Sequence, residues 1–144
     1  MLRRGVLWVL FAVGLLCGGE GRAFAQAGGD GSATAAVAAV IGADGIQRAT
    51  LVLDSYSYTP SHLVVQVNQP VELTLTSVTT LVPHNFVVKD GGLTLEQDVS
   101  PGKSVVLRFT PTQVGTFPFY CDKQLLFFKS HREKGMEGLL DVRP

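Results

Sequence analysis

From about Ile46 onward, apolar and polar residues alternate along the chain, which is the pattern of strands that bury one face. β-branched and aromatic residues fill the apolar positions, and Gly, Pro, Asn and Asp separate the runs. The predicted strands, in chain order, are ATLVLDSY, HLVVQV, VELTLTS, HNFVVKD, LTLEQDV, SVVLRFT, GTFPFYC and EGLLDVRP. Short strands spaced about ten residues apart predict an all-β fold, an antiparallel Greek-key β-sandwich.

One stretch departs from this alternation. Residues 123–134 read KQLLFFKSHREK and contain no turn former, so they favour about two turns of helix. We therefore predict a short helical insertion between the last two strands of the sandwich.

The first 25 residues have the organisation of a cleaved export signal. A short basic start precedes a continuous apolar run, Gly5–Gly19, which is too short for a comfortable membrane span. The small-x-small sequence Ala23-Phe24-Ala25 predicts cleavage after residue 25, and hence a periplasmic or otherwise exported protein. A lipoprotein anchor is disfavoured because Leu16, rather than a small residue, precedes Cys17, whereas twin-arginine export through Arg3-Arg4 stays open.

Residues 26–45 are rich in Gly and Ala and are predicted to form a flexible leader, which leaves residues 46–144 as the folded domain. After signal cleavage nine basic and eleven acidic residues remain, a formal charge of −2. This charge, with no basic cluster, argues against a nucleic-acid partner and against a membrane-surface role. No transmembrane segment is expected after cleavage, and we expect a monomer.

Cleavage also removes Cys17 and leaves Cys121 without a partner for a disulfide. Exported proteins usually pair their cysteines, because the compartment is oxidising, and an exposed free thiol there would be oxidised. Cys121 is therefore either a buried apolar residue of the core or a thiolate held by a metal ion.

The metal-capable residues of the β-domain favour the second alternative. Cys121 ends an apolar strand, His131 and Met136 follow it, and His84 lies far upstream in Pro83-His84-Asn85. Calcium and magnesium prefer oxygen ligands, and zinc gains little from a thioether. A thiolate, two imidazoles and a thioether suit both Cu(I) and Cu(II), so we predict one copper ion per chain.

These motifs resemble those of the cupredoxins, the blue-copper proteins that include plastocyanin, azurin and the sulfocyanin-like group. The resemblance covers roughly residues 46–144 and rests on the Pro-His-Asn loop and on GTFPFYC followed by HREKGMEGLLDV. It implies a cupredoxin-like sandwich in which His84, Cys121 and His131 are equatorial ligands and Met136 is the axial ligand. It also implies that Asn85 ties the two ligand loops together by hydrogen bonds.

The sequence departs from the family in one respect. Most relatives have two to four or so residues between the Cys and the next His, whereas residues 122–130 intervene here. The extra residues must bulge away if Cys121 and His131 are to reach the same ion. Two nearby carboxylates, Asp122 and Glu133, are alternatives to Met136 as the axial ligand.

The leading functional hypothesis is single-electron transfer between redox partners by Cu(I)/Cu(II) cycling. The alternative is a periplasmic copper carrier, buffer or assembly factor, which a long loop that opens would favour. An enzyme is not expected, because copper oxidases and nitrite reductases need further His-rich copper sites. Beyond the two assigned histidines, the mature sequence offers only His62.

The apolar run of the insertion has two possible roles. Its side chains either pack onto the end of the sandwich or form an exposed patch where a redox protein docks. Lysines and an arginine surround the run and would steer an acidic partner toward it. The candidate docking residues are Leu125, Leu126, Phe127 and Phe128.

Overall fold

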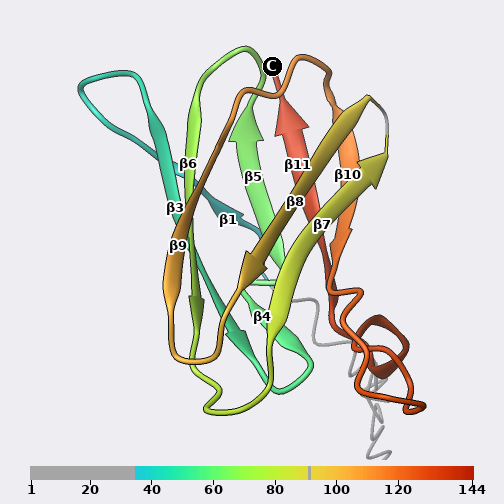
Figure 1. Ribbon diagram of the computed structural model, residues 1–144. Helices are drawn as coiled ribbons and strands as arrows, with labels where there is room; N and C mark the ends of the chain where they lie inside the picture. The colour runs from blue at the N-terminus through green and yellow to red at the C-terminus, as the bar shows by residue number, and fades with distance from the viewer. Residues whose placement is uncertain (1–34, 91) are drawn as a thin grey trace, which may run out of the picture. The chain divides into compact units, whose positions relative to one another are not determined.

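The computed structural model describes residues 35–90 and 92–144, which form two β-sheets facing each other across one hydrophobic core (Figure 1). The predicted signal peptide, and the leader up to residue 34, lie outside these residues. The predicted all-β fold is confirmed, and the described part of the chain contains a single helical element, the 3-10 helix η1 (Arg132–Lys134). None of the described residues forms a helix that is long and apolar enough to cross a membrane.

The two sheets have the strand orders β1-β5-β11-β10-β7-β8 and β2-β3-β6-β9, and β4 pairs with β3. The strands of the first sheet are β1 (Val37–Ala38), β5 (His62–Gln66), β11 (Glu137–Arg143), β10 (Gly115–Tyr120), β7 (His84–Asp90) and β8 (Leu93–Val99). Those of the second sheet are β2 (Val40–Ile41), β3 (Gln47–Asp54), β6 (Val71–Ser77), β9 (Ser104–Phe109) and β4 (Ser57–Thr59).

Every strand predicted from the alternation is present, but the sheets are mixed rather than antiparallel throughout. β3 pairs with β6 in parallel, and β5 pairs in parallel with both β11 and β1. Two parallel neighbours need a crossover connection between them. The chain supplies one by crossing from β3 to the other sheet as β5 before it returns as β6. The three-residue strand β4 was not predicted because it is too short to show alternation.

Two short strands lie inside the segment predicted to be a flexible leader. β1 pairs with β5 and β2 pairs with β3, so each extends one edge of a sheet. The predicted leader is therefore too long, because residues 37–41 belong to the sandwich. Alanine-rich sequence carries little periodic signal, but its backbone N–H and C=O groups can still pair with an open sheet edge.

The two-turn helix predicted for residues 123–134 is also corrected. Only η1 is helical, and residues 124–130 form turns and irregular backbone. Leu126 has a φ of 51°, which lies outside the helical region. Short helices in proteins are stabilised mainly by burying an apolar face, and the side chains of residues 125–128 stay exposed. Nothing here offsets the cost of nucleating a helix.

The alternation decides which side chains fill the core. Along β6, Val71, Leu73 and Leu75 are buried, whereas Glu72 and Thr74 are partly exposed on the other face. Burying an aliphatic side chain of this kind contributes roughly 1.5–3 kcal/mol to the stability of the fold.

A cluster of three aromatic rings packs at one end of this core. The centroids of Phe86 and Phe119 lie 5.0 Å apart, and Tyr58 contacts both rings edge-on at 6.3 Å and 5.1 Å. Residues two apart on a strand share a face, so Phe86 lies on the same face as His84, and Phe119 on the same face as Cys121. The three rings therefore form a packed aromatic floor beneath His84 and Cys121.

Candidate metal centre

One thiol and two imidazoles converge at the end of the sandwich where β7 begins and β10 ends (Figure 1). His84 is the first residue of β7, Cys121 directly follows β10, and His131 directly precedes η1. Their donor atoms all lie within 4.8 Å of one another, and all three residues are buried. The Sγ of Cys121 is 3.3 Å from Nδ1 of His131 and 4.0 Å from Nδ1 of His84. Three of the four predicted residues thus come together as one cluster.

A single backbone hydrogen bond explains how the long loop lets Cys121 and His131 meet. The His131 N–H donates to the Lys123 carbonyl at 2.8 Å. Residues 124–130 therefore leave the loop and return to it, and we call this segment the excursion. Along the path that the hydrogen bond closes, only Asp122 and Lys123 lie between the thiol and the imidazole. The bulge expected from the sequence is present in this form.

Met136 joins the same loop from its other end. The Cys121 N–H donates to the Met136 carbonyl at 3.1 Å, and the Met136 N–H donates to the His131 carbonyl at 3.0 Å. The Met136 side chain is fully buried and belongs to the core cluster that also contains Cys121. The backbone therefore fixes the one described methionine directly beside the thiol and the second imidazole.

Asn85 connects the two parts of the site, as the family resemblance implied. Its Nδ2 donates to the Asp122 carboxylate at 2.7 Å, and the Asp122 N–H donates back to its Oδ1 at 3.1 Å. Its backbone N–H points at the Cys121 sulfur at 3.4 Å. The hydroxyl of Tyr58, which the sequence did not single out, donates to the Asn85 carbonyl from the aromatic floor. β7 and the Cys121 loop are thereby held in one register.

The two carboxylates that could replace Met136 are engaged elsewhere. Glu133 is exposed, and it accepts hydrogen bonds from the Ser130 N–H at 2.7 Å and from the Ser130 hydroxyl at 2.9 Å. Asp122 is committed to Asn85. Neither carboxylate belongs to the cluster of donor atoms found among the described residues.

Burial keeps the three donors in their neutral forms when no metal is bound at neutral pH. It lowers the pKa of His84 to about 4, and the neighbouring His131 acts in the same direction. Burial, followed by the positive charge of Lys134, lowers the pKa of His131. Burial raises the pKa of the Cys121 thiol, against the opposing effect of the Asn85 N–H. Neutral imidazole is the form that binds a metal, whereas the thiol must release its proton on binding.

The donor set fits copper. A thiolate and two imidazoles, with a thioether-bearing residue beside them, suit both Cu(I) and Cu(II), whereas hard cations prefer oxygen. The Nε2 atom of His84 is buried and has no hydrogen-bond partner among the described residues. Buried polar atoms are normally paired, so hydrogen bonding within the protein does not explain the placement of this ring. The other ring nitrogen, Nδ1, faces the Cys121 sulfur, which is where a shared ion would lie.

One contact of the site has no signal in the sequence. The ring of Tyr56 meets the ring of His131 edge-on, with centroids 5.1 Å apart and an interplanar angle of 74°. Tyr56 lies in the turn between β3 and β4, whereas the sequence alone predicts it as the last residue of the strand ATLVLDSY. Sequence analysis therefore missed this residue.

The apolar run of the excursion remains exposed instead of packing onto the sandwich. The side chains are exposed by 63% at Leu125, 76% at Leu126, 84% at Phe127 and 51% at Phe128. A groove of about 500 Å³ separates the start of the excursion from residues 81–83, and His131 is among its lining residues. The buried site thus has an apolar approach on this side.

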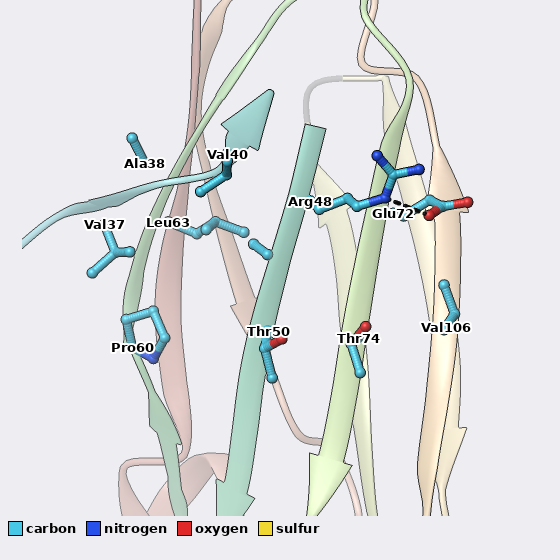
Figure 2. A pocket seen from close by; sticks show the side chains of 11 residues that line it. Val37, Ala38, Val40, Arg48, Thr50, Pro60, Leu63, Glu72, Thr74 and Val106 are labelled. Carbon is cyan, nitrogen blue, oxygen red and sulfur yellow. Dashed lines mark hydrogen bonds and ion pairs between the residues drawn. The ribbon is translucent and has the colours of Figure 1, made fainter. Parts of the chain in front are cut away.

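A second groove of about 500 Å³ lies between β1 and the strands β3, β6 and β9 (Figure 2). Its walls are aliphatic side chains and threonines, and Arg48 pairs with Glu72 at one end with an N–O distance of 3.1 Å. The described residues that line it include no cysteine, histidine or methionine. This groove therefore offers no second copper site.

Comparison with known proteins identifies the fold and the family. A protein-family model described as "Cupredoxin-like domain" matches residues 31–135. The metal binding domain of the Cu(I)-exporting P-type ATPase of Streptococcus pneumoniae D39 is 22% identical with a TM-score of 0.59, and the match covers 77% of this chain and 98% of that domain. Auracyanin from Roseiflexus castenholzii is 20% identical with a TM-score of 0.58, and the match covers 72% of this chain and all of that protein. These structural likenesses establish the cupredoxin fold.

Two curated relatives are copper-containing nitrite reductases. The enzyme of Cereibacter sphaeroides is 34% identical over 90 residues, and that of Pseudomonas chlororaphis is 40% identical over 88 residues. Each match covers 57% of this chain but only 23% or 24% of the enzyme. The chain therefore spans about a quarter of the length of these relatives.

The lowered pKa of His84 predicts how the stability of the metal-free protein depends on pH. In the unfolded chain this imidazole takes up a proton near its ordinary pKa of about 6.5, whereas in the folded protein it does so only near pH 4. The unfolded state therefore binds more protons between these values, and stability falls as the pH drops from about 6.5 to 4. The loss is on the order of 3 kcal/mol.

Urea unfolding of the metal-free protein at pH 7.5 and pH 4.5 measures this loss, and His84→Gln is the comparison. Asp and Glu residues that titrate in the same range contribute equally to both proteins, so the difference between them isolates His84. An equal pH dependence in both proteins would contradict the assignment.

Proposed function

The chain belongs to the cupredoxin-like family, and on that premise we propose that it is an exported carrier of single electrons with one copper ion. The observation that supports the proposal best is the buried cluster of one thiol and two imidazoles, which hydrogen bonds hold between β7 and the Cys121 loop. When bound, copper would supply one-electron chemistry by alternating between Cu(I) and Cu(II).

The residues that would hold the ion are the three of the cluster and one more. His84 and His131 would bind through Nδ1 and Cys121 through Sγ, since these are the atoms that face one another. Met136 would be the fourth residue to hold the ion, because its backbone is hydrogen-bonded to both Cys121 and His131 and its side chain is buried.

Fast electron transfer requires that the ligands move little between the two oxidation states. Here the ligand positions are set by the protein itself: Asn85 ties β7 to the Cys121 loop, and the aromatic floor packs beneath both. The Asn85 N–H aimed at the Cys121 sulfur would withdraw charge from the thiolate and so tune the reduction potential. Burial of all three donors excludes bulk water from the site.

The excursion would be the docking surface for a redox partner. Its four exposed apolar side chains are surrounded by cations, namely Lys123, Lys129, Arg132 and Lys134. Lys123 is neutralised by Asp98 at 2.7 Å and Arg132 by Glu137 at 3.6 Å, whereas Lys129 and Lys134 have no acidic partner among the described residues. This surface suits a partner with an apolar contact patch and an acidic rim, and electron-transfer encounters need only a small interface.

Copper delivery is the second candidate function. The observation that favours it is the exposed excursion beside His131, which would let a receiving protein reach a ligand without unfolding the sandwich. One of the fold relatives is itself named as the metal binding domain of a Cu(I) exporter. Release of copper to a chelator within seconds would favour delivery, and retention over hours would favour electron transfer.

Nitrite reduction is the activity of the two curated relatives, and we do not propose it for this chain. The described residues contain one cluster of three metal-capable side chains, and His62 lies apart from it beside Asp141 at 3.2 Å. Consumption of nitrite by the copper-loaded protein with an electron donor would overturn this part of the proposal.

Copper titration of the metal-free protein tests the site directly. We expect an intense thiolate-to-copper charge-transfer band that saturates at one copper per chain, because Cys121 provides the thiolate. Visible absorption and electron paramagnetic resonance measure it, and Cys121→Ser is expected to abolish the band. Weak copper binding with no such band, unaffected by the substitution, would reject the electron-carrier proposal.

The axial assignment is tested by two substitutions in the same loop. Met136→Leu is expected to keep the charge-transfer band but to change the copper hyperfine splitting and the reduction potential, since the axial ligand tunes both. Glu133→Gln is expected to change neither, because its carboxylate is bound to Ser130. If Glu133→Gln changed the hyperfine splitting and the reduction potential and Met136→Leu did not, the carboxylate would be the ligand.

The charge of the docking surface predicts how small redox ions react with the copper-loaded protein. Reduction by the anion hexacyanoferrate(II), followed by stopped flow, should slow as salt is added, and Lys129→Met should slow it about two- to fivefold at low ionic strength. Lys89→Met removes the same formal charge near the other end of β7, five residues along the strand from His84, and should have little effect. Equal slowing by both substitutions would show that net charge, and not this surface, governs the rate.

A further inference from the structure

We propose that Tyr56 is a positioning residue for His131. The tyrosine ring, held by Lys134, covers the imidazole of His131 and limits access to the metal-binding donors. The proposal rests on the proposed function in so far as His131 is taken as a copper ligand. The cover itself is a property of the chain that can be measured without metal.

His131 is buried in a part of the chain that is otherwise open. Its exposed fraction is 3%, although Arg132 and Glu133 after it are exposed and Ser130 before it is only partly buried. The other ligand candidates cover one side of the ring, since the His84 ring lies with its centroid 5.1 Å away. Tyr56 covers another, edge-on at a centroid distance of 5.1 Å. Aromatic pairs of this geometry attract each other beyond the effect of the area that they bury.

The backbone of Tyr56 has a conformation that is unfavourable for tyrosine. β3 and β4 pair Asp54 with Ser57, so Ser55 and Tyr56 form a two-residue hairpin loop. Tyr56 has a φ of 63°, in the left-handed region where such loops prefer Gly or Asn. A residue with a Cβ is strained there, and asparagine less so than most. At Asn68, with a φ of 60°, the chain uses asparagine for the same conformation.

Lys134 fixes the tyrosine ring from the ligand loop. Its Nζ donates to the Tyr56 hydroxyl at 3.0 Å and lies 4.1 Å from the centroid of the ring. Lys134 also belongs to the turn that carries His131, since its N–H donates to the His131 carbonyl at 3.1 Å. Tyr56 therefore contacts the ligand loop at two points and joins it to the β3–β4 hairpin of the other sheet.

Tyr56 also stands between the site and solvent. It lines the groove of about 500 Å³ together with Lys134, His131 and the first residues of the excursion. Without the ring, the groove would extend to the edge of the imidazole that the ring now covers. A chelator or an anion in the groove would then reach more of the imidazole than the small part that is exposed in the native protein.

The substitution Tyr56→Asn separates the cover from the fold. Asparagine fits the left-handed backbone, so this variant should fold at least as well as one that keeps the strained tyrosine. Tyr56→Phe is the matched control, because it loses the hydrogen bond to Lys134 but keeps the ring and the ammonium group that lies over it. Lys134→Met is a second variant that frees the ring without touching the hairpin.

The first experiment uses the full chain without metal. Diethylpyrocarbonate modifies accessible neutral imidazoles, and peptide mass spectrometry can follow His131 and His62 separately, so His62 serves as the internal reference. We expect Tyr56→Asn to raise the rate at His131 at least tenfold relative to His62, Tyr56→Phe less than twofold, and Lys134→Met by an intermediate factor. Urea unfolding must show that each variant is as stable as the native protein, so that global opening does not contribute.

The second experiment uses the copper-loaded protein and a chelator in excess. Tyr56→Asn should release copper at least tenfold faster than the native protein, and added imidazole should change its electron paramagnetic resonance spectrum but not that of Tyr56→Phe. An unchanged His131 rate in a stably folded metal-free Tyr56→Asn protein would overturn the cover. Failure of every variant and of the native protein to form a thiolate-copper band would overturn the proposed function instead, and the metal-free result would still decide on Tyr56.

Discussion

A buried thiol and two buried imidazoles can share one ion only if the chain brings residue 131 back to residue 123. The hydrogen bond between the His131 N–H and the Lys123 carbonyl does this, and the rest of the site depends on it. With that bond in place, Cys121, His131 and Met136 lie on one small ring of backbone that their own N–H and C=O groups close. Without it, residues 122–130 would be a flexible span, and ordering so many residues around an ion would cost about 1–2 kcal/mol for each of them.

The opposite side of the site is built from the sheet and not from a loop. β7 enters with His84 and Asn85, and Asn85 exchanges two hydrogen bonds with Asp122 while its backbone contacts the thiol and Tyr58. The Cys121 loop, which is closed by its own hydrogen bonds, thus packs against β7, and β7 is buried on both faces along most of its length. The exposed apolar side chains of the excursion lie outside this framework, and the excursion meets the site at the groove beside His131.

Much of the fold could be read from the sequence, because burial on alternate positions is a property of single strands. The eight strands from Ala49 to the C-terminus, and the four candidate ligands, follow from period and from side-chain chemistry. Three features depend on backbone hydrogen bonds, which do not depend on the type of side chain: the parallel pairing, the strands β1 and β2, and the loop closure at Lys123. The helix was predicted from the lack of turn formers in residues 123–134, but helices of that length need a surface to cover, and the excursion has none. Tyr56 stayed hidden because its role depends on a backbone conformation that its residue type would normally avoid.

The hydrogen-bonded loop formed by Cys121, Lys123, His131 and Met136 separates two tasks, metal binding and partner contact. The residues that would hold the ion are fixed on one side of the Lys123–His131 hydrogen bond, and the residues that would meet a partner lie on the other. Doubling the length of a flexible segment costs only about 0.6 kcal/mol in closure entropy. The excursion could therefore be exchanged for a longer, shorter or differently charged segment with little loss of stability in the hydrogen-bonded loop. Partner choice can then diverge, in evolution or by design, while the metal chemistry stays the same.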